Sequence, residues 1–453
     1  MRKLLFIITI SLLASSCSVY KKYTRPELVT DNLYGANIEN SQSSIADISW
    51  QDLFTDPHLQ QLITLAIENN PDMQIAAERI VAAQATLRSA KLAFLPSLSF
   101  DPSFSTNTSN SSSYTLPLNA SWAIDITGNI LNNKRSAQSA YEQSNLYRQS
   151  VQTALISAVA SNYYTLLMLD AQMAISRSTA ATWKENVRIM KAMKLAGMTN
   201  EASVSQTEAN SCEIETSLFD LEYKIIGIEN AIALLIGSTP QKIVRGTIHD
   251  QSFNNKLDVG IPAQLLSRRP DVRSAEKRLE QAFYNTNIAR GSFIPNLILG
   301  GSLQYGLTGW LASFTAKMSA EIFNAGKNSA RLKVAQAEQQ QALISFRHTL
   351  LEAGSEVNDA LTKCHTARSK QDIRTRQIAA LQSAVNSTQQ LMRHSESTYL
   401  EVLTAQQKLL SAQLSQIADK VEEIQGIIAL YHALGGGIDQ NEDISALPKR
   451  VRK

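Results

Sequence analysis

The stretch IENNPDMQIAAERIVAAQATLRSAKLAFLPSL, residues 67–98, decides the fold because the chain contains it twice. Residues 266–297, LSRRPDVRSAEKRLEQAFYNTNIARGSFIPNL, follow it in one register without a gap. The matched pairs are Pro71 and Pro270, Asp72 and Asp271, Ala76 and Ala275, Arg79 and Arg278, Ala83 and Ala282, Ala90 and Ala289, Phe94 and Phe293, Pro96 and Pro295, and Leu98 and Leu297. A period of 199 residues in a chain of 453 indicates a duplicated half-protein rather than a solenoid repeat. The sequence therefore predicts two halves of one architecture, related by a pseudo-symmetry axis.

Most of each half has a helical pattern. Segments 129–197 and 327–394 each predict one long helix of about 100 Å at 1.5 Å per residue. Shorter helices are expected at 59–94, 200–236, 264–293 and 397–434. One apolar set late in the chain repeats at alternating spacings of four and three, which indicates a coiled-coil seam: Leu410, Leu414, Ile417, Val421, Ile424, Ile428 and Tyr431. Two short helices placed end to end match one long helix, so we expect a long helical cylinder rather than a globule.

Each half interrupts the helices once with a strand pair, at about 97–126 and 296–323. Apolar and polar residues alternate there, as in Tyr114, Leu116, Leu118 and Trp122 against Thr115, Asn119 and Ser121. Strict alternation over about ten residues is typical of a transmembrane strand with its apolar side toward lipid. The alternative is two half-buried hairpins on a soluble core, but little sequence is left to build a layer beneath them.

Four strands cannot close a barrel, because the smallest membrane barrels have about eight. An open edge in lipid would leave backbone groups unpaired at a cost of several kcal/mol each. The chain is therefore expected to share its barrel with copies of itself. Two copies would give eight strands and a filled interior, so an open duct needs at least three. The predicted fold class is mainly α with a transmembrane β-barrel: duplicated half-repeats, a coiled-coil helical barrel and a 12-strand trimeric β-barrel.

The amino terminus has the pattern of a bacterial export signal over residues 1–16, with Arg2 and Lys3 before an apolar run. Small residues precede Cys17, a pattern that predicts acylation of this cysteine as the first mature residue. The alternative is ordinary cleavage nearby. Beyond Cys17 the sequence has no apolar run of the 18 or more residues that a transmembrane helix needs. The expected divisions are an extended segment at 17–58, a first repeat at 59–262, a second repeat at 263–437 and a tail at 438–453.

Composition excludes several other classes. A net charge of +3 argues against a nucleic-acid partner. Cys212 and Cys364 are expected to be isolated, partly buried thiols rather than a disulfide, and no second Cys/His pair supports a metal site beside Cys364-His365. No nucleophile, base and orienting residue come together in the sequence, so we expect no enzyme and no cofactor beyond a covalent lipid on Cys17. Asp72 and Asp271 follow prolines at helix starts, where helix capping accounts for them.

At this point the residues resemble the outer-membrane efflux channel family of TolC-type proteins, and within it the lipoprotein branch similar to OprM and NodT. The resemblance covers nearly the whole chain and rests on an ordered set of motifs: Tyr23-Thr24-Arg25-Pro26, Trp50-Gln51-Asp52-Leu53-Phe54, Trp122-Ala123-Ile124-Asp125, Arg268-Arg269-Pro270-Asp271, Ile322-Phe323-Asn324-Ala325-Gly326, Tyr399-Leu400-Glu401-Val402-Leu403 and Leu434-Gly435-Gly436-Gly437. It implies a homotrimeric exit duct in the outer membrane of a Gram-negative bacterium, lipid-anchored and extending into the periplasm. Its implied partners are a periplasmic adaptor protein and an inner-membrane efflux pump, usually of the resistance-nodulation-division type.

The resemblance also implies where the duct narrows and meets the adaptor. The helix-to-helix turns at Gly197, Met198 and Thr199 and at Ser395, Glu396 and Ser397 would be the periplasmic tips. Glu401 stands where family members carry an acidic pore residue, while Ser203 and Thr404 stand where further acids often occur. Three Glu401 carboxylates would form a cation-favouring ring. The alternative role for Glu401 is a helix-start charge, stabilised by the helix dipole by about 0.3–1 kcal/mol. The competing function is a lipid-anchored periplasmic coiled-coil scaffold or adaptor without a pore.

Overall fold

The computed structural model describes residues 22–28, 33–34, 44–106, 112–251, 253, 259–260, 262–306, 309–319, 324–393 and 399–437. Contacts divide the chain into two compact units, each built from both sequence halves. The first unit takes residues 1–29, 78–147 and 271–349, and the second takes 30–77, 148–270 and 350–453. The predicted divisions at 59–262 and 263–437 stay a prediction.

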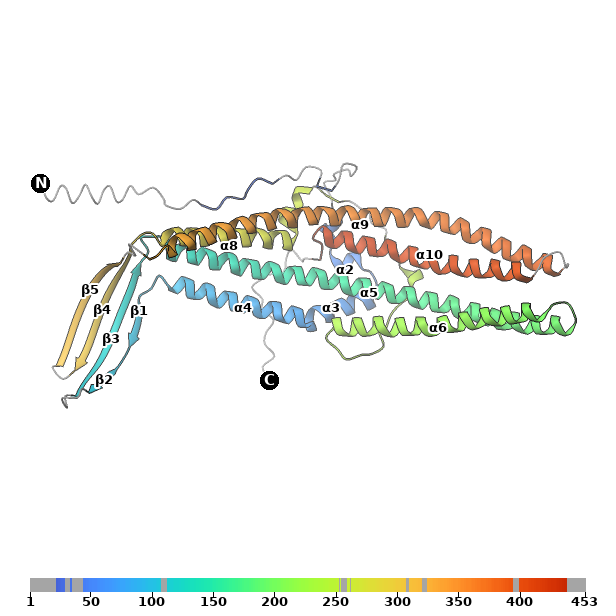
Figure 1. Cartoon of the computed structure of the whole chain (residues 1–453), viewed down its shortest axis with the longest axis horizontal. Coiled ribbons are helices and arrows are strands. Elements are labelled where there is room, and N and C mark those ends of the chain that lie inside the picture. Colours follow the sequence, from blue (N-terminus) through green and yellow to red (C-terminus); the bar gives the residue numbers. More distant parts are fainter. Residues whose placement is uncertain are drawn as a thin grey trace. The chain divides into compact units, whose positions relative to one another are not determined.

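The helices of the two halves match in length to the residue. Helices α5 (Asn129–Leu195) and α9 (Lys327–Arg393) each have 67 residues. Helices α6 (Glu201–Leu235) and α10 (Tyr399–Ala433) each have 35, and α4 (Pro71–Leu92) and α8 (Pro270–Gly291) each have 22 (Figure 1). The shorter elements are η1 (Ile45–Asp47), α2 (Trp50–Leu53), α3 (Pro57–Asn69), η2 (Ile248–Asp250), η3 (Pro262–Gln264) and α7 (Leu265–Arg268). These equal lengths confirm the duplicated, mainly helical fold.

Two predicted helices are each broken at a proline. The expected helix at 59–94 is divided at Asn70 into α3 and α4, and that at 264–293 is divided at Arg269 into α7 and α8. Asn70 and Arg269 have extended backbone, with ψ of 131° and 121°. A residue before proline is excluded sterically from the helical region, so Pro71 and Pro270 each begin a new helix. The predictions of single helices there were wrong.

Equivalent polar side chains fasten these two breaks to equivalent helix ends. Asn70 donates Nδ2–H to the Leu235 carbonyl oxygen at the end of α6 (2.9 Å), and its Oδ1 accepts the Asp72 N–H (2.8 Å). Arg269 donates Nη1–H to the Ala433 carbonyl oxygen at the end of α10 (2.9 Å) and to Glu356 Oε2 (2.6 Å). Asn70, rather than the expected Asp72, thus supplies the capping oxygen of α4.

Glycines in the left-handed conformation stop the helices. Gly197, Gly237 and Gly435 have φ of 72°, 67° and 83°. Each donates its N–H to the carbonyl three residues back, and the next N–H binds the carbonyl five back, as in a Schellman motif. The Gly435-Gly436-Gly437 run therefore stops helix α10. Gly435 packs closely against the second break, because a Cβ at this position would lie 3.0 Å from the Arg268 carbonyl carbon.

The sheet joins the two halves of the sequence. Its strands are β1 (Ser97–Phe100), β2 (Ser103–Thr106), β3 (Ser112–Ile124), β4 (Asn296–Gly306) and β5 (Gly309–Ser319). They pair antiparallel in the order β1-β3-β4-β5, with β2 also pairing with β3. The first predicted strand is split at Asp101-Pro102, because proline lacks the N–H that the ladder requires. Residues 320–323 of the last predicted strand lie outside the described residues.

In the second unit, four long helices run side by side, and side-chain contacts join them in the sequence α9 to α10, α10 to α5 and α5 to α6 (Figure 1). Lys370 and Arg374 of α9 pair with Glu422 and Asp419 of α10. Asn186 of α5 donates Nδ2–H to Gln406 Oε1 of α10 (2.9 Å). Three ion pairs then join α5 to α6: Lys184–Glu215, Lys191–Glu208 and Lys194–Glu201. Helix α6 also contacts α10, so α5, α6 and α10 pack against one another.

No helix in the described part of the chain combines the length and the hydropathy needed to cross a membrane.

Candidate functional site

The strand sheet presents one continuous apolar face. Pairing sets Leu116 opposite Tyr305, Leu118 opposite Leu303 and Trp122 opposite Leu299. The same face continues onto β1 and β5 through Phe100, Ala312, Ala316 and Met318. Large side chains on it are exposed in the chain, among them Leu98, Phe100, Phe104, Leu118, Leu303, Phe314 and Met318. The opposite face carries hydroxyls that bond across strands, such as Ser302 to Ser313 (2.8 Å). The predicted alternation is confirmed.

Aromatic side chains lie at both ends of this apolar face. Near the β4–β5 turn, the Tyr305 ring lies 5.1 Å from Trp310 and 6.4 Å from Tyr114, between centroids. At the other end, Trp122 donates Nε1–H to the Phe94 carbonyl oxygen just before β1 (2.9 Å). Aromatic residues flanking an apolar strand band are the arrangement found at the two interfaces of membrane strands.

The tip turn between α5 and α6 is built from local contacts. Gly197 ends α5, and Asn200 caps α6 by accepting the Ser203 N–H on Oδ1 (2.9 Å). Leu195 and Met198 are highly exposed there. The Lys–Glu pairs at residues 184–215, 191–208 and 194–201 hold the two helices together below the turn. The sequence reasoning missed this ladder, although its lysines and glutamates recur at near-heptad spacing on both helices.

Glu401 and Ser203 occupy equivalent positions, each the third residue of its helix. Ser203 is half-buried in the first turn of α6 and Glu401 is exposed in the first turn of α10. Thr404 is exposed, and its hydroxyl donates to the Leu400 carbonyl oxygen one turn back (2.8 Å). The second turn, with Ser395, Glu396 and Ser397, lies outside the described residues, as does Cys17. The pore role of Glu401, Thr404 and Ser203 stays a prediction.

A buried cluster behind the tips was also missed by the sequence reasoning. Trp183 of α5 is 1% exposed and contacts Ala180, Ile214 of α6 and Leu403 of α10. It joins three helices just below the turns. A lone tryptophan in a helical stretch has no pattern that reveals its partners.

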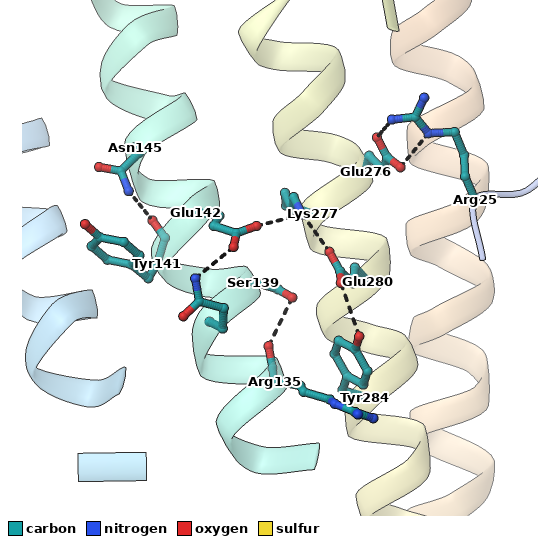
Figure 2. A network of polar contacts seen from close by, with 11 residues as sticks. Arg25, Arg135, Ser139, Tyr141, Glu142, Asn145, Glu276, Lys277, Glu280 and Tyr284 are labelled. Atoms are coloured by element: carbon teal, nitrogen blue, oxygen red, sulfur yellow. Dashed lines mark hydrogen bonds and ion pairs between the residues drawn. The ribbon is translucent and has the colours of Figure 1, made fainter. Parts of the chain in front are cut away.

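The amino-terminal segment 22–28 is fastened to α8 within the first unit. Arg25 binds Glu276 with both ends of its guanidinium, Nε to Oε1 and Nη2 to Oε2, each at 2.6 Å (Figure 2). Tyr23 stacks edge-on against Phe283 at 5.7 Å between ring centroids. Burial raises the pKa of the Tyr23 hydroxyl above its usual range. The Tyr23-Thr24-Arg25-Pro26 motif is therefore a strap held by specific contacts.

The side of α8 that faces α5 carries a separate polar network (Figure 2). Lys277 lies between Glu142 of α5 (2.7 Å) and Glu280 (2.9 Å), and Tyr284 donates its hydroxyl to Glu280 (3.2 Å; Figure 2). Burial raises the pKa of Glu142, but its hydrogen bonds with Lys277 and Gln138 and the charge of Lys277 together lower it below its usual value. The network joins α8 to α5, and each of its charged side chains lies beside one of opposite charge.

The two remaining cysteines are separate. Cys212 is exposed on α6, whereas Cys364 is buried between α9 and α10 and carries no disulfide, as expected. Burial raises the pKa of the Cys364 thiol to about 11. Among the described residues, no group of three or more His, Cys, Asp or Glu side chains could hold a metal ion.

Comparison with known proteins gives consistent matches along the chain. A family model described as outer membrane efflux protein matches residues 62–238 and again 261–436. CusC of Escherichia coli O6:H1, named a cation efflux system protein, is 26% identical over 450 residues, which cover 95% of this chain and 98% of CusC. SilC of Salmonella typhimurium, named a probable outer membrane lipoprotein, is 26% identical over 457 residues, covering 96% of this chain and 98% of SilC.

A solved structure of CusC, described in terms of folding and transmembrane channel formation, has the same fold. It aligns with a TM-score of 0.84 and 26% identity, covering 93% of this chain and 100% of that chain. These matches favour an efflux channel over the scaffold alternative, and their family is one of transport rather than of enzymes. Because the family model covers more than half of the sequence, in two consecutive matches, the chain belongs to the outer membrane efflux protein family.

Proposed function

We propose that three copies of the chain form the outer-membrane exit duct of a tripartite efflux system. The observation that carries this proposal is the apolar sheet face, which is exposed in the single chain. Among the described residues, β1 and β5 each pair on one side only, so each chain offers two open edges. Pairing β5 of one copy with β1 of the next would satisfy these edges and close a barrel.

Strand length supports a membrane location for the barrel. Strands β4 and β5 have 11 residues each. At about 3.3 Å per residue and a tilt of roughly 40°, each spans about 28 Å along the barrel axis. That height matches the apolar band of roughly 25 Å in outer-membrane barrels. Three copies give twelve strand positions and room for a hydrated lumen, whereas two would give a filled barrel of eight.

The proposal includes an anchor and partners. Cys17 carries a covalent lipid in the outer membrane, which the name of SilC supports for a relative, and no other cofactor is needed. From Cys17 to Arg25 the chain can reach about 28 Å. Along α8, Glu276 lies 15 residues before its end at Gly291, about 22 Å away. The strap is therefore long enough for the lipid to reach the level at which the strands begin.

At the periplasmic end, the turns at Gly197, Met198 and Thr199 and at Ser395, Glu396 and Ser397 meet a periplasmic adaptor. An inner-membrane pump, of the resistance-nodulation-division type, supplies the energy. Glu401 of three copies forms the carboxylate ring of the constriction, with Thr404 and Ser203 beside it. Such a ring raises the local concentration of cations and lowers that of anions.

Reconstitution in a planar bilayer tests the duct and its constriction together. The purified protein is expected to form water-filled conductances that prefer cations. Glu401→Gln should lower the cation-to-anion permeability ratio, and Ser203→Glu should raise it by adding a second ring. If the unmodified protein and both variants have equal cation-to-anion permeability ratios, Glu401 does not line the constriction. If the protein assembles in the bilayer but gives no conductance, the duct is refuted and the scaffold without a pore becomes the favoured function.

A further inference from the structure

The arginine that the duplication repeats in α4 and α8 has an aromatic partner in the first repeat only. Helices α4 and α8 align at a spacing of 199, which makes Arg79 and Arg278 equivalent, and α5 and α9 align at a spacing of 198. In the first repeat, the guanidinium carbon of Arg79 lies 4.6 Å from the centroid of the Tyr147 ring on α5, a cation–π contact. In the second repeat, the equivalent of Tyr147 is Ser345, which has no ring. Among the described residues, Arg278 therefore has no ring partner.

A groove between α8 and α9 lies where the ring is missing. It has a volume of about 430 Å³, and both Arg278 and Ser345 line it. Further polar side chains surround it: Gln281, Asn285, Glu338 and Gln341. Within the described part of the chain, only Asn285 of this set bonds to another side chain, by accepting the Ser136 hydroxyl on Oδ1 (2.8 Å). The groove thus offers an arginine, a carboxylate and amide groups to a ligand.

The polar side chains around the groove are specific to the second repeat. The first-repeat equivalents of Gln281 and Glu338 are Ala82 and Ala140. The second repeat therefore has lost the aromatic ring and has gained hydrogen-bonding groups around the space that the ring would fill. This combination is typical of a ligand site, in which a few polar groups orient a molecule in a preformed concavity.

The groove lies on the side of α8 opposite the strap. The strap packs on α8 through Glu276 and Phe283 (Figure 2). At 3.6 residues per turn, Arg278, Gln281 and Asn285 point roughly 180° away from that side. The strap leads to the proposed lipid anchor and so runs on the outer surface of the proposed duct. The groove then faces the inside of the duct, along the path of exported molecules.

We infer that this groove binds a small phenolic molecule, whose ring stacks on the Arg278 guanidinium as the Tyr147 ring stacks on Arg79. This inference rests on the proposed duct, because only the duct places the groove on a transport path. Guanidinium groups stack on aromatic faces. A phenol hydroxyl both donates and accepts hydrogen bonds, so it can donate to the Glu338 carboxylate and accept from the Gln341 amide. An aromatic carboxylate fits less well, because Glu338 would repel it.

Photolabelling of the full-length protein in isolated membranes tests the site. The probe is 4-hydroxybenzophenone, a phenol that inserts into nearby C–H bonds when illuminated. Peptide mass spectrometry should find the label on α8 and α9 beside Arg278, and an excess of p-cresol, which is the tyrosine side chain as a free molecule, should compete with it. Ser345→Tyr supplies the ring that the first repeat already has, so it should fill the groove and abolish this label.

A matched pair of charge removals tests the stacking. Arg278→Gln should weaken binding of the probe about two- to fivefold, the loss expected for an exposed cation–π contact. Arg79→Gln removes the same charge at the equivalent position, which Tyr147 already covers, and should leave the label unchanged. Equal effects of the two variants would overturn the stacking on Arg278.

Two further outcomes separate the groove from the duct. Undiminished label on α8 and α9 in Ser345→Tyr, in a protein that still conducts in a planar bilayer, would overturn the phenol site and leave the duct standing. Label that Ser345→Tyr abolishes, in a protein that gives no conductance, would overturn the duct and with it the place of the groove on a transport path.

Discussion

Replacing Asn70 by alanine tests whether the polar residue before each repeated proline fastens two helices. Asn70 is 5% exposed and both ends of its amide are used. Removing the cap oxygen that accepts the Asp72 N–H costs about 1 kcal/mol. Leaving the Leu235 carbonyl without its donor costs about 1 kcal/mol more. The free energy of local opening should therefore fall by about 2 kcal/mol.

Amide hydrogen exchange in the native protein measures that opening directly. At tenfold per 1.4 kcal/mol, amides at the start of α4 and the end of α6 should exchange about 30-fold faster in Asn70→Ala. Asn70→Asp keeps the cap oxygen and loses the donor, so it should show about a fivefold effect. Asn69→Ala is the matched control, because among the described residues the Asn69 side-chain amide donates to the Leu65 carbonyl oxygen within its own exposed turn. Less than threefold acceleration in Asn70→Ala, or equal acceleration in both alanine variants, would refute the reasoning.

Three further outcomes follow from the structure. Gly426→Ala should destabilise the α9–α10 hairpin, because its Cβ would lie 2.7 Å from Cys364 Sγ; a denaturation midpoint equal to that of the unmodified protein would contradict this contact. A maleimide should label Cys212 and spare Cys364, which is buried with a pKa raised to about 11; equal labelling rates in the folded protein would show that α9 and α10 separate. The pKa of Glu142 is lower in the folded protein than its unfolded value of 4.5. The ionised carboxylate therefore contributes its full stabilisation above about pH 4.5, and this contribution is lost as the pH falls through the folded pKa. Glu142→Gln should therefore lower the melting temperature at pH 7, and this difference should shrink as the pH falls through the folded pKa of Glu142. A difference that stays constant on acidification would contradict the prediction.

The duplication made most of the fold predictable. Helix bounds at 129–197 and 327–394 were close, because no proline interrupts either segment. The failures came at prolines. Pro71 and Pro270 lie inside otherwise continuous helical patterns, and Pro102 lies inside an alternating one. Each removes a backbone N–H and restricts the preceding residue, which ends the element locally without disturbing the pattern on either side.

The candidate site was less accessible to sequence reasoning, because its contacts join distant residues. Arg25 and Glu276 are separated by 251 positions, and only the folded chain brings the strap to α8. Glu401 and Ser203 were placed correctly near helix starts, and for Ser203 the signal was Gly197, which ends the preceding helix. In the proposed duct, the side chains that face the lumen depend on how neighbouring copies pack.

The native mass of the membrane-extracted protein tests the central claim most directly. Mass spectrometry from detergent should give three copies per particle, each with an acylated amino-terminal Cys17. This result would match a barrel shared by three sheets and an outer-membrane anchor. A stable, folded monomer would leave the edges of β1 and β5 unpaired in each chain and would contradict the shared duct.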